Sequence, residues 1–87
     1  MDRRYSMESR SIIGTLLRET RSAAGVVQED LAERLRRSQS YISRIERGEI
    51  RLGILQLREI LEAIGADMTT FIARIEELVA RRRSGDE

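Results

Sequence analysis

Residues 28–48 decide the fold of this chain, and they read QEDLAERLRRSQSYISRIERG. Apolar residues three and four positions apart, with two acids in the first turn, predict a helix over residues 28–36. Ser38 can act as the N-cap of a second helix over residues 39–47, and Gly48 can end that helix. The stretch therefore predicts two short helices joined by a tight turn.

The second predicted helix has one apolar and one polar face. Ile42 and Ile45 lie on the inward face. The outward face carries Gln39, Ser40, Tyr41, Ser43, Arg44 and Arg47. In the major groove of DNA, Gln can pair with adenine and Arg with guanine through two hydrogen bonds. We therefore interpret the stretch as a helix-turn-helix motif whose second helix, residues 39–47, is the recognition helix.

Three further helices are predicted around this motif, and the fold class is therefore all-α with five helices. The first covers residues 9–24, where Ile and Leu recur at helical spacing before a terminating glycine. The fourth covers residues 54–64 and stops at Gly65. The fifth is capped by Asp67 and runs from residue 68 to about residue 82.

The two ends of the chain lack this helical pattern. Residues 1–8 and 84–87 are polar and charged, so we expect a flexible N-terminus and a flexible tail around a single domain over residues 9–83. Met7 is an alternative start that the sequence does not decide. With no apolar run of membrane-spanning length and no signal-peptide pattern, we expect a cytoplasmic protein without a membrane partner.

The composition excludes several kinds of chemistry. The chain has no Cys and no His, and all 16 basic residues are Arg. Disulfides and thiolate metal sites are therefore excluded, and no His, Cys or Lys is available as a nucleophile or general base. We expect no enzymatic activity, no metal and no cofactor.

Charge is segregated along the chain, although the net charge is only +1. Residues 34–51 hold six Arg and two acids, whereas residues 52–77 hold two Arg and five acids. A basic region around the recognition helix suits a DNA-facing surface. Arg37, Arg47 and Arg51 are candidates for contacts with DNA phosphates, which set affinity without reading the base sequence.

The segment from Ile13 to Ile72 resembles the phage repressor and Cro type of helix-turn-helix protein, also called the Xre family. The resemblance depends on the joint order of Arg21, Gly25, Gln28-Glu29-Asp30-Leu31-Ala32, Ser38 to Glu46, Gly48 and Ala63-Ile64-Gly65. It implies a five-helix, repressor-like DNA-binding domain. Small proteins of similar layout include restriction-modification controller proteins, prophage repressors and single-domain antitoxins.

The resemblance also implies roles for individual residues. Gln39, Ser40 and Arg44 are expected to contact DNA bases. Contacts with the DNA backbone fall to Gln28, at the start of a helix where an anion is favoured, and to Tyr41, Ser43 and Arg47. Arg21 and Glu46 correspond to a partly buried ion pair that ties the first helix to the third.

Four positions depart from the family pattern. Arg36 occupies the place of a usual Gly in the turn, where a non-glycine residue carries strain of about 1 kcal/mol. Arg37 replaces an apolar turn residue, Leu52 stands near a usual Pro, and Thr20 replaces an aliphatic residue. These departures leave the fold intact, and the two arginines add charge beside the DNA.

The apolar residues of the C-terminal half exceed what one core needs, and a surplus apolar strip on a small domain is more often an interface than an accident. We expect a homodimer through Leu52, Leu55, Ile72, Ile75 and Val79. A two-fold dimer would place its recognition helices about 34 Å apart and would require a roughly palindromic operator.

The leading hypothesis is therefore a sequence-specific transcriptional regulator of a prokaryote or phage that binds double-stranded DNA as a homodimer. An antitoxin that autoregulates its operon is one alternative. A helical adaptor that binds protein without DNA is another, from a different class. The sequence identifies neither the operator nor the controlled operon, nor an effector, nor a protein partner such as a toxin or RNA polymerase, and it does not distinguish activation from repression.

Overall fold

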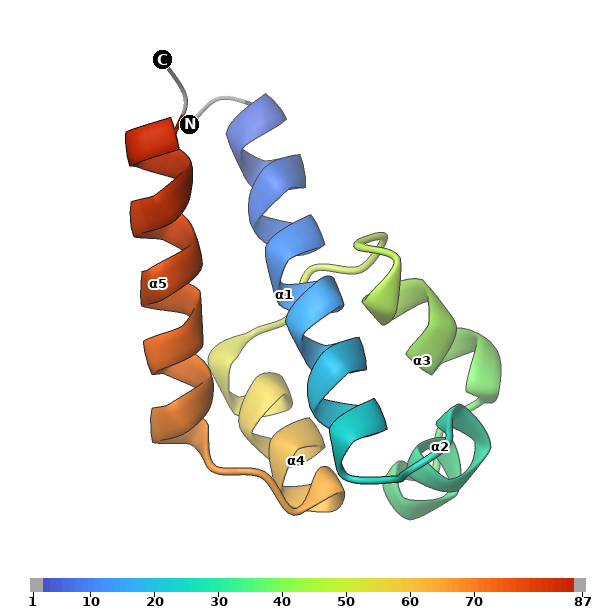
Figure 1. The fold of residues 1–87 in the computed structure, drawn as a ribbon. Coiled ribbons are helices and arrows are strands. Elements are labelled where there is room, and N and C mark those ends of the chain that lie inside the picture. Colours follow the sequence, from blue (N-terminus) through green and yellow to red (C-terminus); the bar gives the residue numbers. More distant parts are fainter. Residues whose placement is uncertain (1–2, 86–87) are drawn as a thin grey trace.

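The computed structural model describes residues 3–85, which form five helices without a β-strand. The helices are α1 (Arg3–Ala23), α2 (Gln28–Leu35), α3 (Gln39–Glu46), α4 (Ile54–Ile64) and α5 (Met68–Gly85). Figure 1 shows α1 in the middle of the molecule, with α5 on one side and with α2 and α3 on the other. The prediction of an all-α fold of five helices is confirmed.

Both long helices extend further than the sequence predicted. The first begins at Arg3, about six residues before the predicted start, so residues 3–8 are helical where a flexible N-terminus was expected. These residues include no Gly or Pro that would stop a helix, although they lack an apolar stripe. At the other end, Ser84 and Gly85 belong to α5 and not to a flexible tail. The remaining predicted flexible residues, 1–2 and 86–87, lie outside the described part of the chain.

Local sequence signals explain most helix ends. Ser38 Oγ accepts a hydrogen bond from the N–H of Tyr41 at 3.1 Å at the start of α3. Asp67 Oδ2 accepts a hydrogen bond from the N–H of Thr70 at 2.9 Å at the start of α5. Gly65 ends α4 with a φ of 89°, a conformation that glycine adopts without steric cost. Both predicted caps are therefore present.

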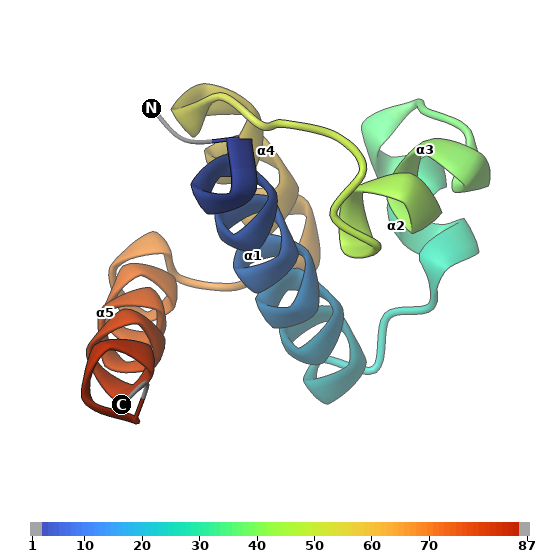
Figure 2. The same cartoon turned by 90° about the horizontal axis from the view of Figure 1, so that it is seen from above.

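A single apolar core joins the helices. The largest fully buried side chains are Leu16, Leu17, Leu31, Ile42 and Leu61, which come from the first four helices. The helix α5 adds Phe71, which is 3% exposed. The first helix contacts α3, α4 and α5, whereas α2 contacts α3 and α4. Figure 2 shows α1 with α5 on one side and α3 on the other. The core therefore holds α3 against α1 and α2.

Gly14 allows the closest approach between α1 and α3. A Cβ atom added at this position would lie 2.6 Å from the Ile45 carbonyl oxygen and 2.7 Å from the Glu46 carbonyl oxygen. Both oxygens belong to the backbone of the last turn of α3, so they cannot move aside without moving the helix. The absence of a side chain at Gly14 therefore sets the distance of α3 from the rest of the molecule.

Candidate nucleic-acid interface

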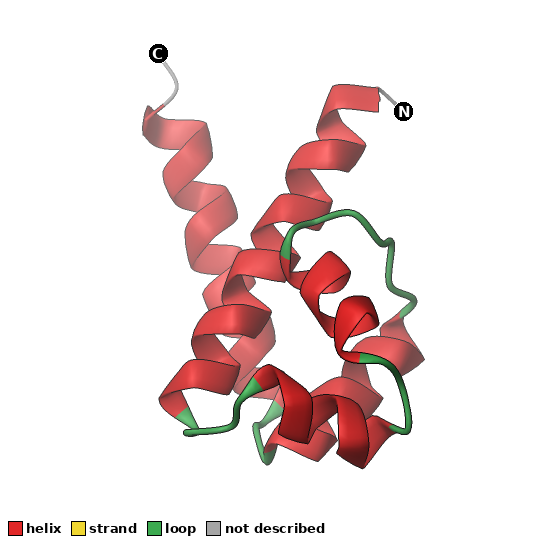
Figure 3. Ribbon diagram, turned by 90° about the vertical axis from the view of Figure 1, so that its right-hand side faces the viewer, coloured by secondary structure: helices red, strands yellow, loops and turns green. Residues whose placement is uncertain are grey.

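The turn between α2 and α3 has a left-handed backbone at Arg36. This residue ends α2 with φ 57° and ψ 45°, and it is the one non-glycine residue of positive φ in the described range 3–85. Its N–H donates to carbonyl oxygens at the end of α2, and the N–H of Arg37 donates to the Ala32 oxygen at 2.9 Å. These bonds close the turn and direct the chain into α3. Figure 3 shows the short loops that join these helices.

The outward face of α3 is largely exposed. The side chains of Gln39, Ser40 and Arg44 are exposed, whereas Ile42 and Ile45 beneath them are 2% and 3% exposed. The helix ends at Glu46, one residue before the predicted end, and Arg47 is its C-cap. The three residues that the resemblance associates with base contacts therefore share one accessible surface.

Tyr41 is less exposed than Gln39, Ser40 and Arg44 on this face. Its ring is half-buried and packs against the core, and the guanidinium carbon of Arg37 lies 4.6 Å from the ring centroid. A cation over an aromatic face is attracted by the ring quadrupole. Ser43 is also half-buried. The tyrosine and Arg37 thus form one stacked unit at the start of α3.

Arg21 and Glu46 form the ion pair that the resemblance implied. Arg21 Nε lies 2.6 Å from Glu46 Oε2, and the second bond, from an Arg21 terminal nitrogen to Glu46 Oε1, is 3.0 Å long. The other terminal nitrogen donates to the Val26 carbonyl oxygen at 2.8 Å. The hydrogen bond with Glu46 raises the pKa of Arg21, so the guanidinium group stays charged. This bidentate pair joins the last turn of α1 to the last turn of α3.

Two glutamines extend this ion pair to the surface. Gln28 Nε2 donates to Glu46 Oε1 at 2.9 Å, and Gln39 Nε2 donates to Gln28 Oε1 at 3.3 Å. A chain of polar contacts thus runs from buried Arg21 to exposed Gln39, the first residue of α3. The sequence indicated the two ends of this chain but not the link through Gln28, which the resemblance associated only with a phosphate.

The arginines near the end of α3 share one carboxylate. Glu49 lies 3.4 Å from Arg44 Nε and 2.8 Å from Arg47 Nε. A terminal nitrogen of Arg47 also donates to Ser43 Oγ at 2.7 Å. The hydrogen bond from Arg47 lowers the pKa of Glu49 below its ordinary value. From the sequence, Glu49 is one of the two acids of the basic region, and its position indicated no role for it.

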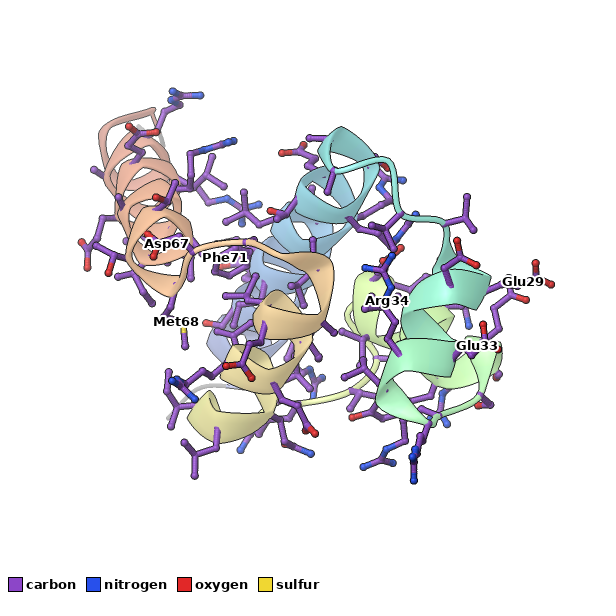
Figure 4. All side chains as sticks on the ribbon, turned by 90° about the horizontal axis from the view of Figure 1, so that it is seen from below. Glu29, Glu33, Arg34, Asp67, Met68 and Phe71 are labelled. Atoms are coloured by element: carbon purple, nitrogen blue, oxygen red, sulfur yellow. The ribbon has the colours of Figure 1, made fainter. Side chains whose placement is uncertain are left out.

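Arg34, an arginine of the basic region, contacts the backbone of α4. A terminal nitrogen of Arg34 donates to the Ala63 carbonyl oxygen at 2.8 Å, in the last turn of α4, where positive charge is favoured by the helix dipole. Figure 4 shows Arg34 between α2 and α4, with Glu29 and Glu33 on the outer side of α2. Arg37 and Arg51, which were predicted to contact phosphates, are exposed.

The residues predicted to form a dimer interface differ in exposure. Leu55 is 75% exposed and Ile72 is 38% exposed. Leu52, Ile75 and Val79 are half-buried, and the first two of these pack partly against the core. Ile54, which was not predicted, is 63% exposed beside Leu55. The apolar surface is therefore strongest at the start of α4.

No helix within residues 3–85 is long and apolar enough to cross a membrane. The same residues contain no group of three or more acidic side chains placed to hold a metal ion.

The short α2, the closed turn and the exposed polar face of α3 define a helix-turn-helix protein. A family model described as a helix-turn-helix domain matches residues 12–71, and the chain belongs to this family. The chain is 28% identical over 71 residues to an uncharacterized HTH-type transcriptional regulator, y4dJ, of Sinorhizobium fredii (strain NBRC 101917 / NGR234). That match covers 82% of this chain and 92% of the relative.

Solved structures give the same family. An XRE-family like protein from Pseudomonas syringae pv. tomato str. DC3000 is 36% identical with a TM-score of 0.72, over 82% of this chain and 88% of that one. The wild-type restriction-modification controller protein C.Esp1396I is 30% identical with a TM-score of 0.72, over 80% of this chain and 93% of that one. The resemblance to the Xre family is confirmed, and these relatives include an HTH-type transcriptional regulator and a restriction-modification controller protein.

Proposed function

We propose that this protein is a sequence-specific transcriptional regulator that inserts α3 into the major groove of DNA. One observation carries the proposal: a polar chain from Arg21 through Glu46 and Gln28 holds Gln39 at the exposed start of α3. Base reading requires side chains that are presented in a fixed geometry by a rigid element. The contacts around α3 provide that rigidity on both its buried and its polar side.

The proposed base contacts are made by Gln39, Ser40 and Arg44. All three side chains are exposed on one face of α3. A glutamine amide can donate and accept at the edge of adenine, and a guanidinium group can donate twice to guanine. Ser40 has one hydroxyl, which can donate or accept, so it is the least selective of the three.

The proposed backbone contacts surround this face. They comprise Gln28, Arg37, Tyr41, Ser43, Arg47 and Arg51. Val27, the N-cap of α2, makes no side-chain hydrogen bond to the first turn, and N–H groups at a helix start favour phosphate. Arg37 and Arg47 carry positive charge at the two ends of α3. We therefore assign them to phosphates on the two sides of the major groove.

The proposed assembly is a homodimer on a roughly palindromic operator. Exposed Leu55 and Ile72 support it because a small domain gains stability by covering apolar surface. Leu52, Ile75 and Val79 complete the proposed interface. A two-fold axis through this surface would present two copies of α3 to successive turns of one face of the DNA.

The first test is selection of bound sequences from a random duplex library at about 0.15 M salt, which suppresses non-specific phosphate binding. A two-fold symmetric motif is the expected result and would establish the reading function and the symmetry together. Absence of enrichment, with no binding to any duplex at low salt, would overturn the proposal and direct the search to protein partners such as a toxin.

The selected duplex allows a test of Arg44 by itself. Arg44→Ala should lose about 1–3 kcal/mol of affinity for the selected duplex, and the loss should disappear when one particular base pair is altered. The matched control is Arg58→Ala, an exposed arginine of α4, which removes the same charge. Fluorescence anisotropy measures the affinity of both variants for a panel of altered duplexes. A uniform loss across the panel would assign Arg44 to the backbone and not to a base.

A further inference from the structure

Glu49 is an exposed acidic residue beside the proposed reading face. It follows α3 in the loop before α4, and its side chain is 46% exposed. Its carboxylate lies 2.8 Å from Arg47 Nε and 3.4 Å from Arg44 Nε, so it pairs with one proposed backbone contact and one proposed base contact. The lowered pKa keeps this carboxylate charged at neutral pH. A negative charge in this place opposes the approach of any DNA phosphate.

The two arginines are held by Glu49 to different extents. Arg47 directs Nε and one terminal nitrogen toward Glu49, at 2.8 and 3.5 Å, and its other terminal nitrogen donates to Ser43 Oγ. Arg47 therefore has to give up internal contacts before it can bind a phosphate. Arg44 faces Glu49 through Nε at 3.4 Å, a longer contact than that of Arg47, so Glu49 holds its guanidinium group less tightly.

We propose that Glu49 is a specificity-determining residue, which acts as an internal counter-ion that penalises non-specific DNA more than the operator. On random DNA both arginines turn to phosphates and leave the carboxylate unpaired beside a polyanion. On the operator, Arg44 binds its base and keeps its pairing with Glu49, so a smaller part of the ion-pair cluster is lost. This inference rests on the proposed DNA-reading function.

The variant that tests this idea is Glu49→Gln, which removes the charge and keeps the shape of the side chain. Glu62→Gln is the matched control, because Glu62 is an exposed acid of α4 with the same charge change. Affinities of the full chain for the selected duplex and for a random duplex are measured by fluorescence anisotropy over a series of salt concentrations.

The expected result is tighter binding of the random duplex by Glu49→Gln, by about twofold to fivefold, the range that an exposed ion pair supports. Binding of the selected duplex should tighten less, so the ratio of the two affinities falls. The salt dependence for random DNA should become steeper, because more phosphate contacts form without opposition. Glu62→Gln should leave the ratio at its wild-type value.

Two results would overturn the inference while leaving the reading function intact. An unchanged affinity ratio for Glu49→Gln would show that the carboxylate does not discriminate between the duplexes. Weaker binding to both duplexes would show that Glu49 supports the fold of the loop instead. If wild-type protein binds neither duplex at low salt, the proposed function itself fails, and this outcome is distinct from the other two.

Discussion

Arg36 occupies a backbone conformation that glycine adopts more easily. At φ 57° its Cβ atom crowds the following peptide group, which costs of the order of 1 kcal/mol. The hydrogen bonds that close the turn compensate for this cost, since the N–H groups of Arg36 and Arg37 both find acceptors in the last turn of α2. The family pattern correctly predicted a left-handed backbone at residue 36, because a glycine is usual at this position of the turn.

Arg36→Gly should therefore stabilise the protein. We expect the free energy of unfolding to rise by about 0.5–1 kcal/mol, since the strain disappears while the unfolded chain gains some conformational freedom. Urea denaturation followed by circular dichroism measures the change. Arg36→Ala is the control, because it removes the charge and keeps the strained backbone. Equal stability of the two variants would show that the backbone at residue 36 is not strained.

Contacts between elements decide where the recognition helix lies. The backbone of α1 touches the last turn of α3 at Gly14, and the Arg21–Glu46 pair joins the same two helices one to two turns further along α1. The packing of Ile42 and Ile45 beneath α3 supplies the third constraint. The position of α3 therefore depends on α1 as well as on its neighbour α2.

Gly14→Ala should destabilise the protein although alanine favours helices. Overpacking against backbone atoms costs about 1–3 kcal/mol, and the gain in helix propensity returns at most about 1 kcal/mol of that. Thr15→Ala, at the exposed neighbouring position, is the control and should change stability little. Thermal and urea unfolding compare the two. If Gly14→Ala were as stable as Thr15→Ala, α1 and α3 would not be in close backbone contact at Gly14.

Sequence reasoning was accurate where a feature depends on neighbouring residues. The bounds of α4 were predicted to the residue because Gly53 and Gly65 flank an apolar pattern, and the cap at Ser38 follows from the same local chemistry. Of the contacts between distant residues around α3, the Arg21–Glu46 pair was expected, and only through the family resemblance. Nothing in the spacing of Gly14 or Gln28 reveals that they lie against the end of α3, because that contact needs the packed fold.

The apolar surface at the start of α4 is a property of the whole molecule. Leu55 and Ile54 are exposed while Leu57 in the next turn is 5% exposed, so the core takes only one face of this helix. The sequence predicted this division for Leu55, because it falls outside the apolar stripe of α4. It did not predict that Leu52 and Ile75 also pack against the core, because one apolar residue can serve both surfaces.

Leu55→Asp should convert the proposed dimer into a monomer. A charge buried in an apolar interface loses its hydration without gaining a partner, so association should be lost while the core is unaffected. Sedimentation velocity at tens of micromolar measures the oligomeric state. Val27→Asp places the same charge at another exposed apolar residue, next to α2, and should leave the dimer intact. A wild-type protein that sediments as a monomer would contradict the proposed interface.

The central place of α1 has a consequence for synthesis of the chain. This helix leaves the ribosome first, yet its partners α3, α4 and α5 all follow it. Until α4 and α5 have emerged, the apolar core that buries Leu16 and Leu17 is incomplete. Premature termination before residue 54 would therefore release a fragment with an incomplete core, a natural substrate for chaperones and proteases. The nascent chain therefore completes its core, and becomes resistant to proteases, only after the last helices have packed against α1.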